Sequence, residues 1–213
     1  MIPVGTAGAR FACNGCGHCC RHLVDLPDPR WPAAFDDLAP FGLYLLPSRG
    51  GLAVWSEERR VMLAEAKRRG FGLAFRPSLA ALDERLGLVA FAWEAEHDVC
   101  PFVGEDNRCG IYDRRPTACR AYPLRHSRGG WTASASCDAA FEPGNGDWPK
   151  AYAACMPAAI AARRAPAEAV ERLQRLEARG LVAPRHALPR EALARALASG
   201  RLVDAADLEE ARA

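Results

Sequence analysis

The chain has 213 residues, half of them hydrophobic, and a formal net charge of +2 at pH 7. This length allows one core of ~100–150 residues with a further segment beside it. The near balance of charge gives no global electrostatic case for a nucleic-acid or membrane-surface partner. No apolar run approaches the ~20 residues that a membrane-spanning helix needs. Residues 1–7 lack the basic start and the apolar stretch of a secretory signal, so we expect a cytoplasmic location.

A cluster of thiols near the N-terminus dominates the chemistry of the sequence. Cys13, Cys16, Cys19 and Cys20 follow the pattern C-x2-C-x2-C-C. A C-x2-C step lets two sulfur atoms face one ion across a tight turn, and glycines at 15 and 17 permit such a turn. Three thiols at this spacing also match the start of the bacterial ferredoxin run. Because Cys20 directly follows Cys19, we expect these two thiols to serve different metals, or different irons of one cluster.

Further cysteines lie far downstream. Cys100, Cys109, Cys119 and Cys137 raise the set of candidate ligands to eight, which is enough for two four-thiolate sites. Cys155 is the odd one out and is expected to be a buried packing residue. A reducing cytoplasm and an odd total of nine cysteines both disfavour a disulfide framework. Metal ligation is therefore the favoured role of the other eight thiols.

The segment between the two cysteine-rich stretches begins with a proline-rich region. Residues 21–50 are predicted to be mostly loop with short helical turns. The apolar spacing of 36–46 also allows one short helix there. A firmer helix is predicted over Ser56–Arg69, with Ser56 as its N-cap, acidic residues in the first turn and basic residues in the last. Gly70 suits the left-handed position that ends a helix. The apolar face of this helix is expected to hold Val61, Met62 and Ala66.

A small β element is predicted next. Residues 88–93 form an apolar run of strand-forming residues. For 78–86, the periodicity does not decide between a strand and a short helix. Phe91 and Trp93 are expected in the core.

The second cysteine-rich stretch is predicted to fold back on itself. Residues 105–107 are typical of a turn that brings Cys109 beside Cys100. Pro116 suits the first position of a short helix that holds Cys119. Residues 131–136 predict an extended segment that ends at Cys137.

The composition changes after a linker at residues 142–149. Helices are then predicted over 151–164, 167–179, 190–199 and 204–212, separated by proline and glycine. We therefore expect an α+β fold with a small, irregular, cysteine- and metal-centred core with short strands, plus a helical C-terminal appendage. The predicted division is a metal-binding domain at 1–141 and a helical region at 150–213. The helices are expected to pack on the core; a hairpin that binds a protein partner is the alternative.

Together the two stretches resemble the YkgJ family of cysteine-cluster proteins, a family of zinc- or iron-chelating domains. The matching residues are the C-x2-C-x2-C-C run, Cys100-Pro101-Phe102, Cys109, Ile111-Tyr112, Arg115-Pro116, Cys119-Arg120, Tyr122-Pro123 and Cys137. They cover residues 11–25 and 97–138. The resemblance implies a small cysteine-ligated metal domain, often one that contains iron–sulfur. It also extends distantly to flagellin lysine-N-methylase, which carries a related cysteine cluster.

Eight thiolates in a small volume need positive charge and hydrogen-bond donors around them. At least one of Arg115 and Arg120 is expected to donate to a thiolate, a cluster sulfide or a neighbouring carbonyl. Surface exposure, or an ion pair with Asp113, is the alternative for these arginines. Tyr112 and Tyr122 are expected to line the metal site, with their hydroxyls hydrogen-bonded to nearby groups.

All-thiolate coordination suits both zinc and an iron–sulfur cluster. The C-x2-C-x2-C run favours iron–sulfur, and the second C-x2-C knuckle of a zinc ribbon is absent from the sequence. Three functions remain open. The first is a metalloprotein for electron transfer, sensing or cluster assembly. The second is an enzyme of the protein-lysine methylase type, and the third is a zinc-stabilised module whose C-terminal helices bind a protein partner.

Overall fold

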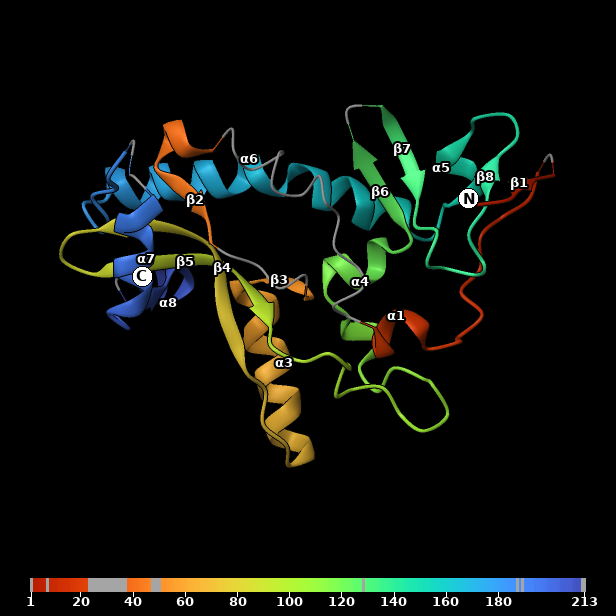
Figure 1. Cartoon of the computed structure of the whole chain (residues 1–213), viewed down its shortest axis with the longest axis horizontal. Helices are drawn as coiled ribbons and strands as arrows, with labels where there is room; N and C mark the ends of the chain where they lie inside the picture. Colours follow the sequence, from red (N-terminus) through yellow and green to blue (C-terminus); the bar gives the residue numbers. More distant parts are fainter. Residues whose placement is uncertain are drawn as a thin grey trace. The chain divides into compact units, whose positions relative to one another are not determined.

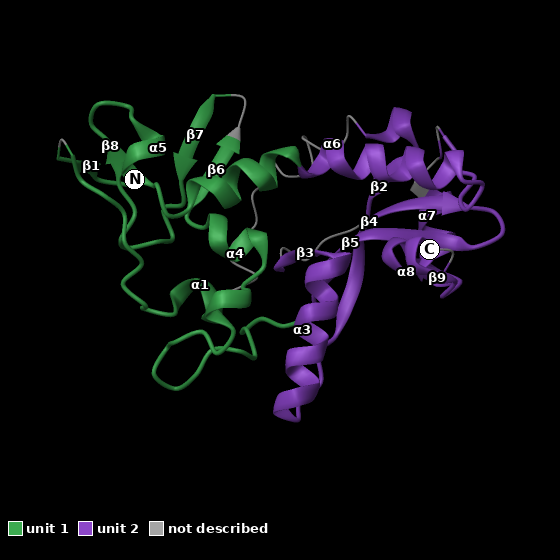
Figure 2. Cartoon of the chain, turned by 180° about the vertical axis from the view of Figure 1, so that it is seen from behind, with its two compact units in different colours: residues 1–26, 97–164 green, residues 27–96, 165–213 purple. Residues whose placement is uncertain are grey.

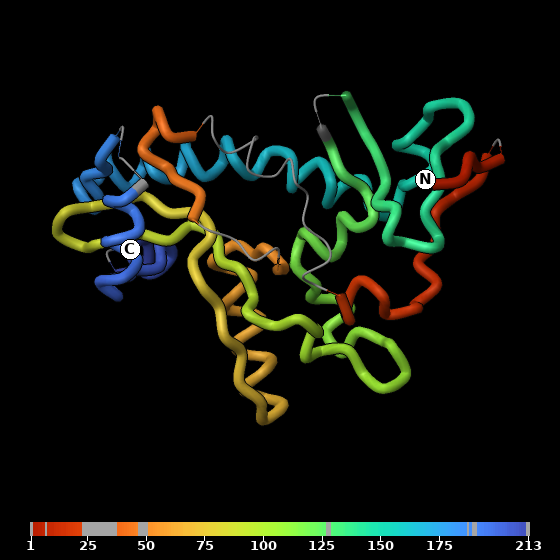
Figure 3. The backbone as a smooth tube through the Cα atoms, viewed as in Figure 1, coloured from red at the N-terminus to blue at the C-terminus, as the bar shows by residue number. Residues whose placement is uncertain are grey.

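Figure 1 shows a computed structural model of the chain, which describes residues 2–6, 8–22, 38–46, 51–127, 129–186, 188 and 190–211. Helices and short strands are mixed along the chain, so the predicted α+β class is confirmed. The chain divides into two compact units (Figure 2): unit 1 comprises Met1–Leu26 and His97–Arg164, and unit 2 comprises Pro27–Glu96 and Ala165–Ala213. The backbone therefore enters each unit twice (Figure 3). The division at residues 142–149 stays a prediction.

Unit 2 is built on a sheet in the order β2-β4-β5-β3, with β9 also paired to β5. The strands are β2 (Leu43–Leu45), β3 (Ala53–Trp55), β4 (Phe75–Asp83), β5 (Gly87–Ala95) and β9 (Leu202–Asp204). β2, β4, β5 and β3 pair antiparallel, whereas β9 runs parallel to β5. All residues of β5 are buried, as the apolar run at 88–93 predicts, and Phe91 and Trp93 lie in the core. Residues 75–83 are a strand, which settles the open alternative at 78–86.

Helices cover both faces of this sheet. Successive side chains of a strand point to opposite faces, and the side chains of β5 on both faces are buried. On one face Leu79, Val89 and Phe91 pack with side chains of α6 (Met156–Ala178) and α8 (Ala205–Glu210). On the other face Leu82 and Leu88 pack with side chains of α7 (Arg190–Ala198). The hairpin of β4 and β5 is therefore covered on both faces by parts of the C-terminal helices.

Helix α3 (Ser56–Arg69) has the predicted bounds, and Gly70 follows it with a φ of 80°. Its N-cap is Trp55 rather than Ser56, and the Trp55 N–H donates to the Glu58 carboxylate at 3.1 Å. Ser56 is fully buried and its hydroxyl donates instead to the Phe91 carbonyl, because the helix start packs against β5. Met62 is buried as expected. Val61 was expected on the buried face but is 40% exposed.

Two other local expectations differ from the structure. The described part of 36–46, where a short helix was left open, forms a 3-10 turn, η2 (Ala39–Phe41), followed by strand β2. Pro40 lies in the first turn, and the left-handed Gly42 ends the turn after one cycle. Most of the proline-rich region 21–50 lies outside the described residues. The helices predicted at 151–164 and 167–179 are replaced by the short α5 (Trp148–Ala151) and one long α6 that contains Pro166. Side chains of α6 on both sides of the proline are buried, which offsets its cost of ~3 kcal/mol.

The C-terminal helices do not all pack on the cysteine-containing unit. Residues 151–159 join an apolar cluster of unit 1, whereas Ala169, Leu173 and Leu176 pack on the sheet of unit 2. Helices α7 and α8 lie within the predicted ranges 190–199 and 204–212. The prediction that the tail packs on the core therefore holds only for its first part. No helix among the described residues is long and apolar enough to cross a membrane.

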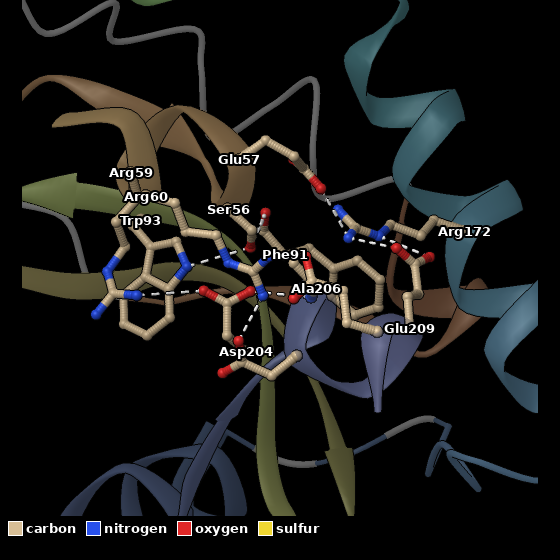
Figure 4. A network of polar contacts seen from close by, with 12 residues as sticks. Ser56, Glu57, Arg59, Arg60, Phe91, Trp93, Arg172, Asp204, Ala206 and Glu209 are labelled. Atoms are coloured by element: carbon tan, nitrogen blue, oxygen red, sulfur yellow. Dashed lines mark hydrogen bonds and ion pairs between the residues drawn. The ribbon is translucent and has the colours of Figure 1, made fainter. Parts of the chain in front are cut away.

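A polar network links α3, α6 and α8 within unit 2 (Figure 4). The guanidinium of Arg59 lies 3.9 Å from the ring centroid of Trp93 and pairs with the buried Asp204 at 3.3 Å. Arg172 of α6 contacts both Glu57, at 2.8 Å, and Glu209, at 2.7 Å. The partly buried guanidinium groups thus tie α3 to α8 and to α6 within unit 2.

Unit 1 has short elements and a large share of irregular backbone. They are β1 (Val4–Gly5), α1 (His18–Arg21), η3 (Tyr112–Arg114), α4 (Thr117–Ala121), β6 (Leu124–Ser127), β7 (Gly130–Ala133), β8 (Glu142–Pro143) and α5. β6 and β7 form a hairpin, and β1 pairs parallel with β8. The fully buried ring of Tyr152 stacks with Phe11, Phe141 and Trp148 at centroid distances of 5.1, 5.3 and 5.6 Å. This stack takes the place of a large apolar core in unit 1.

Asp83 ties the β4–β5 hairpin to the C-terminal segment. Its side chain is 1% exposed and accepts hydrogen bonds from the backbone N–H groups of Arg85, Leu86 and Ala183, at 2.7, 2.9 and 2.6 Å. Burial alone would raise the pKa of Asp83, but these N–H donors and the Arg85 guanidinium outweigh it and lower the pKa. The ionised carboxylate is therefore the form that holds the hairpin and residue 183 together.

Asp83→Asn is expected to lower the free energy of unfolding of unit 2 by about 2 kcal/mol, because an amide cannot accept all of these bonds. Since the folded-state pKa is depressed, the contribution of Asp83 is complete above the ordinary pKa of an aspartate. It is lost as the pH falls below that value and through the lowered one. Chemical denaturation between pH 7 and pH 3 measures this effect. The difference between wild type and variant should shrink with acidification; a constant difference would contradict the assignment.

Candidate metal centre

The two cysteine-rich stretches lie side by side in unit 1. Cys19 and Cys20 lie on the single turn of α1, with their Sγ atoms 4.0 Å apart. The backbone N–H of Cys100 donates to the carbonyl of Cys20 at 2.6 Å. Two cysteines that lie eighty residues apart in the sequence are thus joined by a direct backbone hydrogen bond.

The turn before Cys109 is hydrogen-bonded to α1. Arg21 Nε donates to Asn107 Oδ1 at 2.8 Å, and the Arg21 guanidinium also reaches the Gly104 carbonyl at 3.4 Å. Gly104 and Asn107 close the predicted turn, in which Asn107 is left-handed with a φ of 62°, and Val103 then pairs with Cys109. The turn therefore brings Cys109 back beside Cys100, as the sequence predicts.

Gly17 is the position at which the turn and α1 touch most closely. Its φ is 71°, and a Cβ added there would lie 2.8 Å from Asn107 Cβ, a distance that real side chains do not show. Gly15 has a similar φ of 68°, but an added Cβ there would have nothing within 4 Å. Substitution of Gly15 by alanine therefore carries only the cost of a left-handed backbone, whereas the same substitution at Gly17 also blocks the contact with Asn107.

Cys119 lies in α4, which has Pro116 as its N-cap, one position earlier than predicted. Arg115 precedes this helix, donates to the Tyr112 carbonyl at 2.9 Å and stacks on the Tyr112 ring at 3.6 Å. A carbonyl was one of the acceptors expected for Arg115 or Arg120. Arg120 donates to the Thr117 hydroxyl at 3.2 Å.

Electrostatic interactions divide the thiols into neighbouring sets. Burial raises the pKa of Cys119, and the charges of Cys100, Cys109 and Cys19 raise it further. The hydrogen bond between the thiols of Cys19 and Cys20 raises the pKa of Cys19. The guanidinium of Arg115 acts in the opposite direction and lowers the pKa of both Cys19 and Cys119. Without added positive charge these thiols stay protonated; a metal ion would supply that charge.

A second set surrounds Cys137, which follows the β6–β7 hairpin. Burial raises the pKa of Cys137, and the charges of Cys16 and Cys13 add to this effect. Cys13 and Cys16 are exposed, whereas Cys137 is half-buried. The β7 strand ends at Ala133, and turns carry the chain from there to Cys137.

The described thiols are all free and are neighbours rather than a preformed cage. Among the residues that the structure describes, no group of three or more histidine, cysteine, aspartate or glutamate side chains has a spacing that could hold a metal ion.

Residues 62–138 match the family model CxxCxxCC, which is described as a putative zinc- or iron-chelating domain. The CxxCxxCC match covers roughly a third of the chain and includes Cys100, Cys109, Cys119 and Cys137. The N-terminal C-x2-C-x2-C-C run and Cys155 lie outside it. A search of curated proteins found no match, and a search of solved structures found none. The narrower YkgJ assignment and the similarity to flagellin lysine-N-methylase stay predictions.

The donor chemistry of unit 1, rather than the present spacing of its thiols, suits a bound zinc ion or iron–sulfur cluster. The candidate donors are all sulfur, which suits both groups. The hydroxyl of Tyr122 is buried and interacts with the Ser134 side chain, but no described residue meets the full geometry of a hydrogen bond to it. Burial raises the pKa of Tyr122 to about 12 although the Ser134 side chain lowers it, and the charges of Cys137 and Cys19 add to the rise. This O–H can donate to a thiolate or a sulfide once a metal is bound. Tyr112, in contrast, is 52% exposed.

Sequence patterns do not mark either of the features that the structure adds. The burial of the Tyr122 hydroxyl depends on how α4 and the β6–β7 hairpin pack. Cys155, which lies 6% exposed next to the carbonyl of Tyr122, belongs to no recognisable ligand spacing.

Tyr122→Phe is expected to stabilise the metal-free chain by about 1 kcal/mol, because it removes a buried hydroxyl that has no well-placed hydrogen-bond partner among the described residues. Urea denaturation of metal-free protein measures this change. Tyr112→Phe is the matched control, and its exposed hydroxyl should have an effect within the error of the experiment. Destabilisation by Tyr122→Phe would mean that the hydroxyl is hydrogen-bonded in the metal-free protein.

Gly17→Ala is expected to weaken metal retention about tenfold more than Gly15→Ala, a difference of ~1.4 kcal/mol. Both variants carry the strain of a left-handed alanine, ~1–2 kcal/mol, but only Gly17→Ala pushes α1 away from Asn107. Competition with a chelator of known affinity measures the ratio. Equal losses in the two variants would show that the contact between α1 and the 104–107 turn does not position the thiols.

Proposed function

We propose that this chain is a cytoplasmic metalloprotein that binds an iron–sulfur cluster, or zinc, through thiolates from both cysteine-rich stretches. The observation that carries the proposal is the backbone bond between Cys20 and Cys100, which brings the early thiols against the late ones. The description of the matched domain as zinc- or iron-chelating supports it. The proposed ligands are Cys13, Cys16, Cys19, Cys20, Cys100, Cys109, Cys119 and Cys137.

An iron–sulfur cluster is favoured over zinc for two reasons. The C-x2-C-x2-C spacing is that of ferredoxin ligands, and no second C-x2-C knuckle accompanies it. In addition, a cluster presents inorganic sulfides to its surroundings, and the Tyr122 hydroxyl is a buried donor for which no described residue is a well-placed partner. Hydrogen bonds to sulfur are one of the means by which proteins set the potential of such a cluster.

Each proposed role follows from the contacts of the residue. The cysteines would ligate as thiolates and release their protons to solvent. Arg115, held by the Tyr112 carbonyl and ring, would offset part of the negative charge near Cys19 and Cys119. The bond between Cys20 and Cys100 would keep the two stretches at a fixed separation. A bound iron–sulfur cluster would supply one-electron redox chemistry, which suits electron transfer, redox sensing or cluster assembly.

Anaerobic purification of the full chain tests the proposal. We expect a brown protein with sulfur-to-iron charge-transfer absorption and with iron and acid-labile sulfide bound to it. A colourless protein that retains zinc would support the thiolate site and reject the cluster. Failure to retain either metal, after reconstitution with ferrous iron and sulfide or with zinc, would contradict the function.

Variants in both stretches extend this test. Cys20→Ser and Cys100→Ser should each lower the metal content, because one centre cannot form without ligands from both stretches. Ser136→Ala, which lies beside Cys137 but removes no thiol, is the control. Full metal retention by both cysteine variants would show that these two stretches do not share the bound metal.

A further inference from the structure

Cys19 and Cys20 are the one pair of adjacent cysteines in the chain. Their thiols contact each other in α1, with the Sγ atoms 4.0 Å apart, and both residues are half-buried rather than enclosed. A disulfide between them requires the two sulfur atoms to approach by only ~2 Å. The pair is therefore placed to react with a small oxidant that reaches it from solvent.

The backbone between the two cysteines sets the structural cost of such a bond. Consecutive Cα atoms lie ~3.8 Å apart across a trans peptide, whereas the Cα atoms of a disulfide are usually about 4.4–6.8 Å apart. A disulfide between adjacent residues therefore forces the backbone out of helical geometry. Strained disulfides of this kind are readily reduced again, so the bond is reversible.

Helix α1 offers little resistance to this change. It is a single turn, in which the N–H groups of Cys20 and Arg21 both donate to the Gly17 carbonyl at 3.0 Å. None of its four described residues is buried, and Gly17 at its N-cap has no side chain that could cap it. So short a helix depends on its tertiary contacts, because its own hydrogen bonds do not offset the cost of forming it.

The tertiary contacts of α1 come from the cysteine pair itself and from the next residue. The Cys20 carbonyl accepts from the Cys100 N–H at 2.6 Å, and Arg21 Nε donates to Asn107 Oδ1 at 2.8 Å. A backbone change at Cys19 and Cys20 displaces both the carbonyl and the arginine. Oxidation of the pair therefore competes with the contact between the early and the late cysteine-rich stretches.

We propose that Cys19 and Cys20 form a redox switch: in the metal-free chain a disulfide between them releases α1 from the 104–107 turn and blocks metal uptake. This inference rests on the metal-binding function proposed above and concerns its regulation. Metal-bound thiolates are not available for the reaction, so the switch acts on the empty chain.

The bond forms by exchange with a low-molecular-weight disulfide, such as glutathione disulfide. One cysteine thiol attacks a glutathione sulfur, which gives a mixed disulfide and one reduced glutathione. The neighbouring thiol then attacks the cysteine sulfur of this mixed disulfide and releases the second glutathione. The two cysteines are oxidised, their protons end on two reduced glutathione molecules, and an excess of thiol reverses both steps.

The test equilibrates the metal-free full chain with glutathione buffers of increasing oxidised fraction, blocks free thiols with an alkylating reagent and digests with trypsin. Residues 11–21, which carry all four early cysteines, are released as one peptide. Cys13 and Cys16 should be alkylated, whereas Cys19 and Cys20 should not. Fragment ions should separate residue 16 from residue 19 but not residue 19 from residue 20.

Two cysteine variants check the assignment of the bond. Cys20→Ser should abolish the disulfide, because it removes one of the two sulfur atoms. Cys13→Ser, which also removes a proposed metal ligand, should leave the disulfide unchanged.

A pair of asparagine variants tests the coupling to the late stretch. Asn107→Gly removes the acceptor of the Arg21 bond, and glycine tolerates the left-handed φ of 62° at this position. The disulfide should then reach half-formation at an about tenfold lower ratio of glutathione disulfide to the square of glutathione. Asn14→Gly is the matched control and should not change this ratio, because the Asn14 side chain accepts from the Cys16 N–H instead.

Metal uptake then separates the switch from the proposed function. The oxidised wild-type chain should take up less than about a tenth of the zinc, or of the iron with sulfide, that the reduced chain takes up, and added thiol should restore uptake. A different disulfide partner for either thiol, no disulfide at all, or full uptake by the oxidised chain would overturn the inference and leave the proposed function intact. Equal shifts in Asn107→Gly and Asn14→Gly would also overturn it. A reduced wild-type chain that binds neither metal would reject the proposed function itself.

Discussion

The metal chemistry proposed for this chain depends on one backbone contact, the hydrogen bond from the Cys100 N–H to the Cys20 carbonyl. The thiols before this contact and those after it are separated by the whole first part of unit 2. Closing so long a loop carries an entropic cost, and the cost grows only slowly with length. Arg21 and Gly17 add a side-chain contact and a close approach to Asn107 at the same place. Together these contacts hold α1 against the 104–107 turn.

Unit 2 explains how the intervening segment can be so long. Residues 51–96 form a hairpin and a helix that bury their apolar faces against α6, α7 and α8. The intervening segment is therefore not a free loop but part of a compact unit with its own core. The family match begins in α3 and ends after Cys137, so it takes in parts of both units. The chelating chemistry itself belongs to the residues of unit 1, in which all the cysteines lie.

Charge is the second constraint. Thiolates repel one another, and burial raises the pKa of Cys100 and Cys119, so the isolated thiols are held protonated. The guanidinium of Arg115 lowers the pKa of Cys19, Cys119 and Cys155. One guanidinium cannot balance eight thiolates. A bound metal would therefore contribute to the stability of unit 1, which has few regular elements and an aromatic stack in place of a large core.

Local chemistry made much of the fold predictable. Caps and charges marked Ser56–Arg69 as a helix, and the apolar run at 88–93 marked a buried strand. Tertiary packing decided the rest: it carried α6 through Pro166, exposed Val61 and buried Ser56. The eight candidate thiols followed from spacing, whereas the buried position of Cys155 follows from its packing beside Tyr122 and Tyr152. The burial of the Tyr122 hydroxyl, for which no described residue is a well-placed partner, is likewise a product of packing.

The most direct measurement of the central claim is X-ray absorption at the metal edge of the anaerobically purified full chain. Thiolates from the two stretches predict a first coordination shell made only of sulfur, whether the metal is iron or zinc. Oxygen or nitrogen as the main scatterers in that shell would contradict the assignment of the metal to these cysteines.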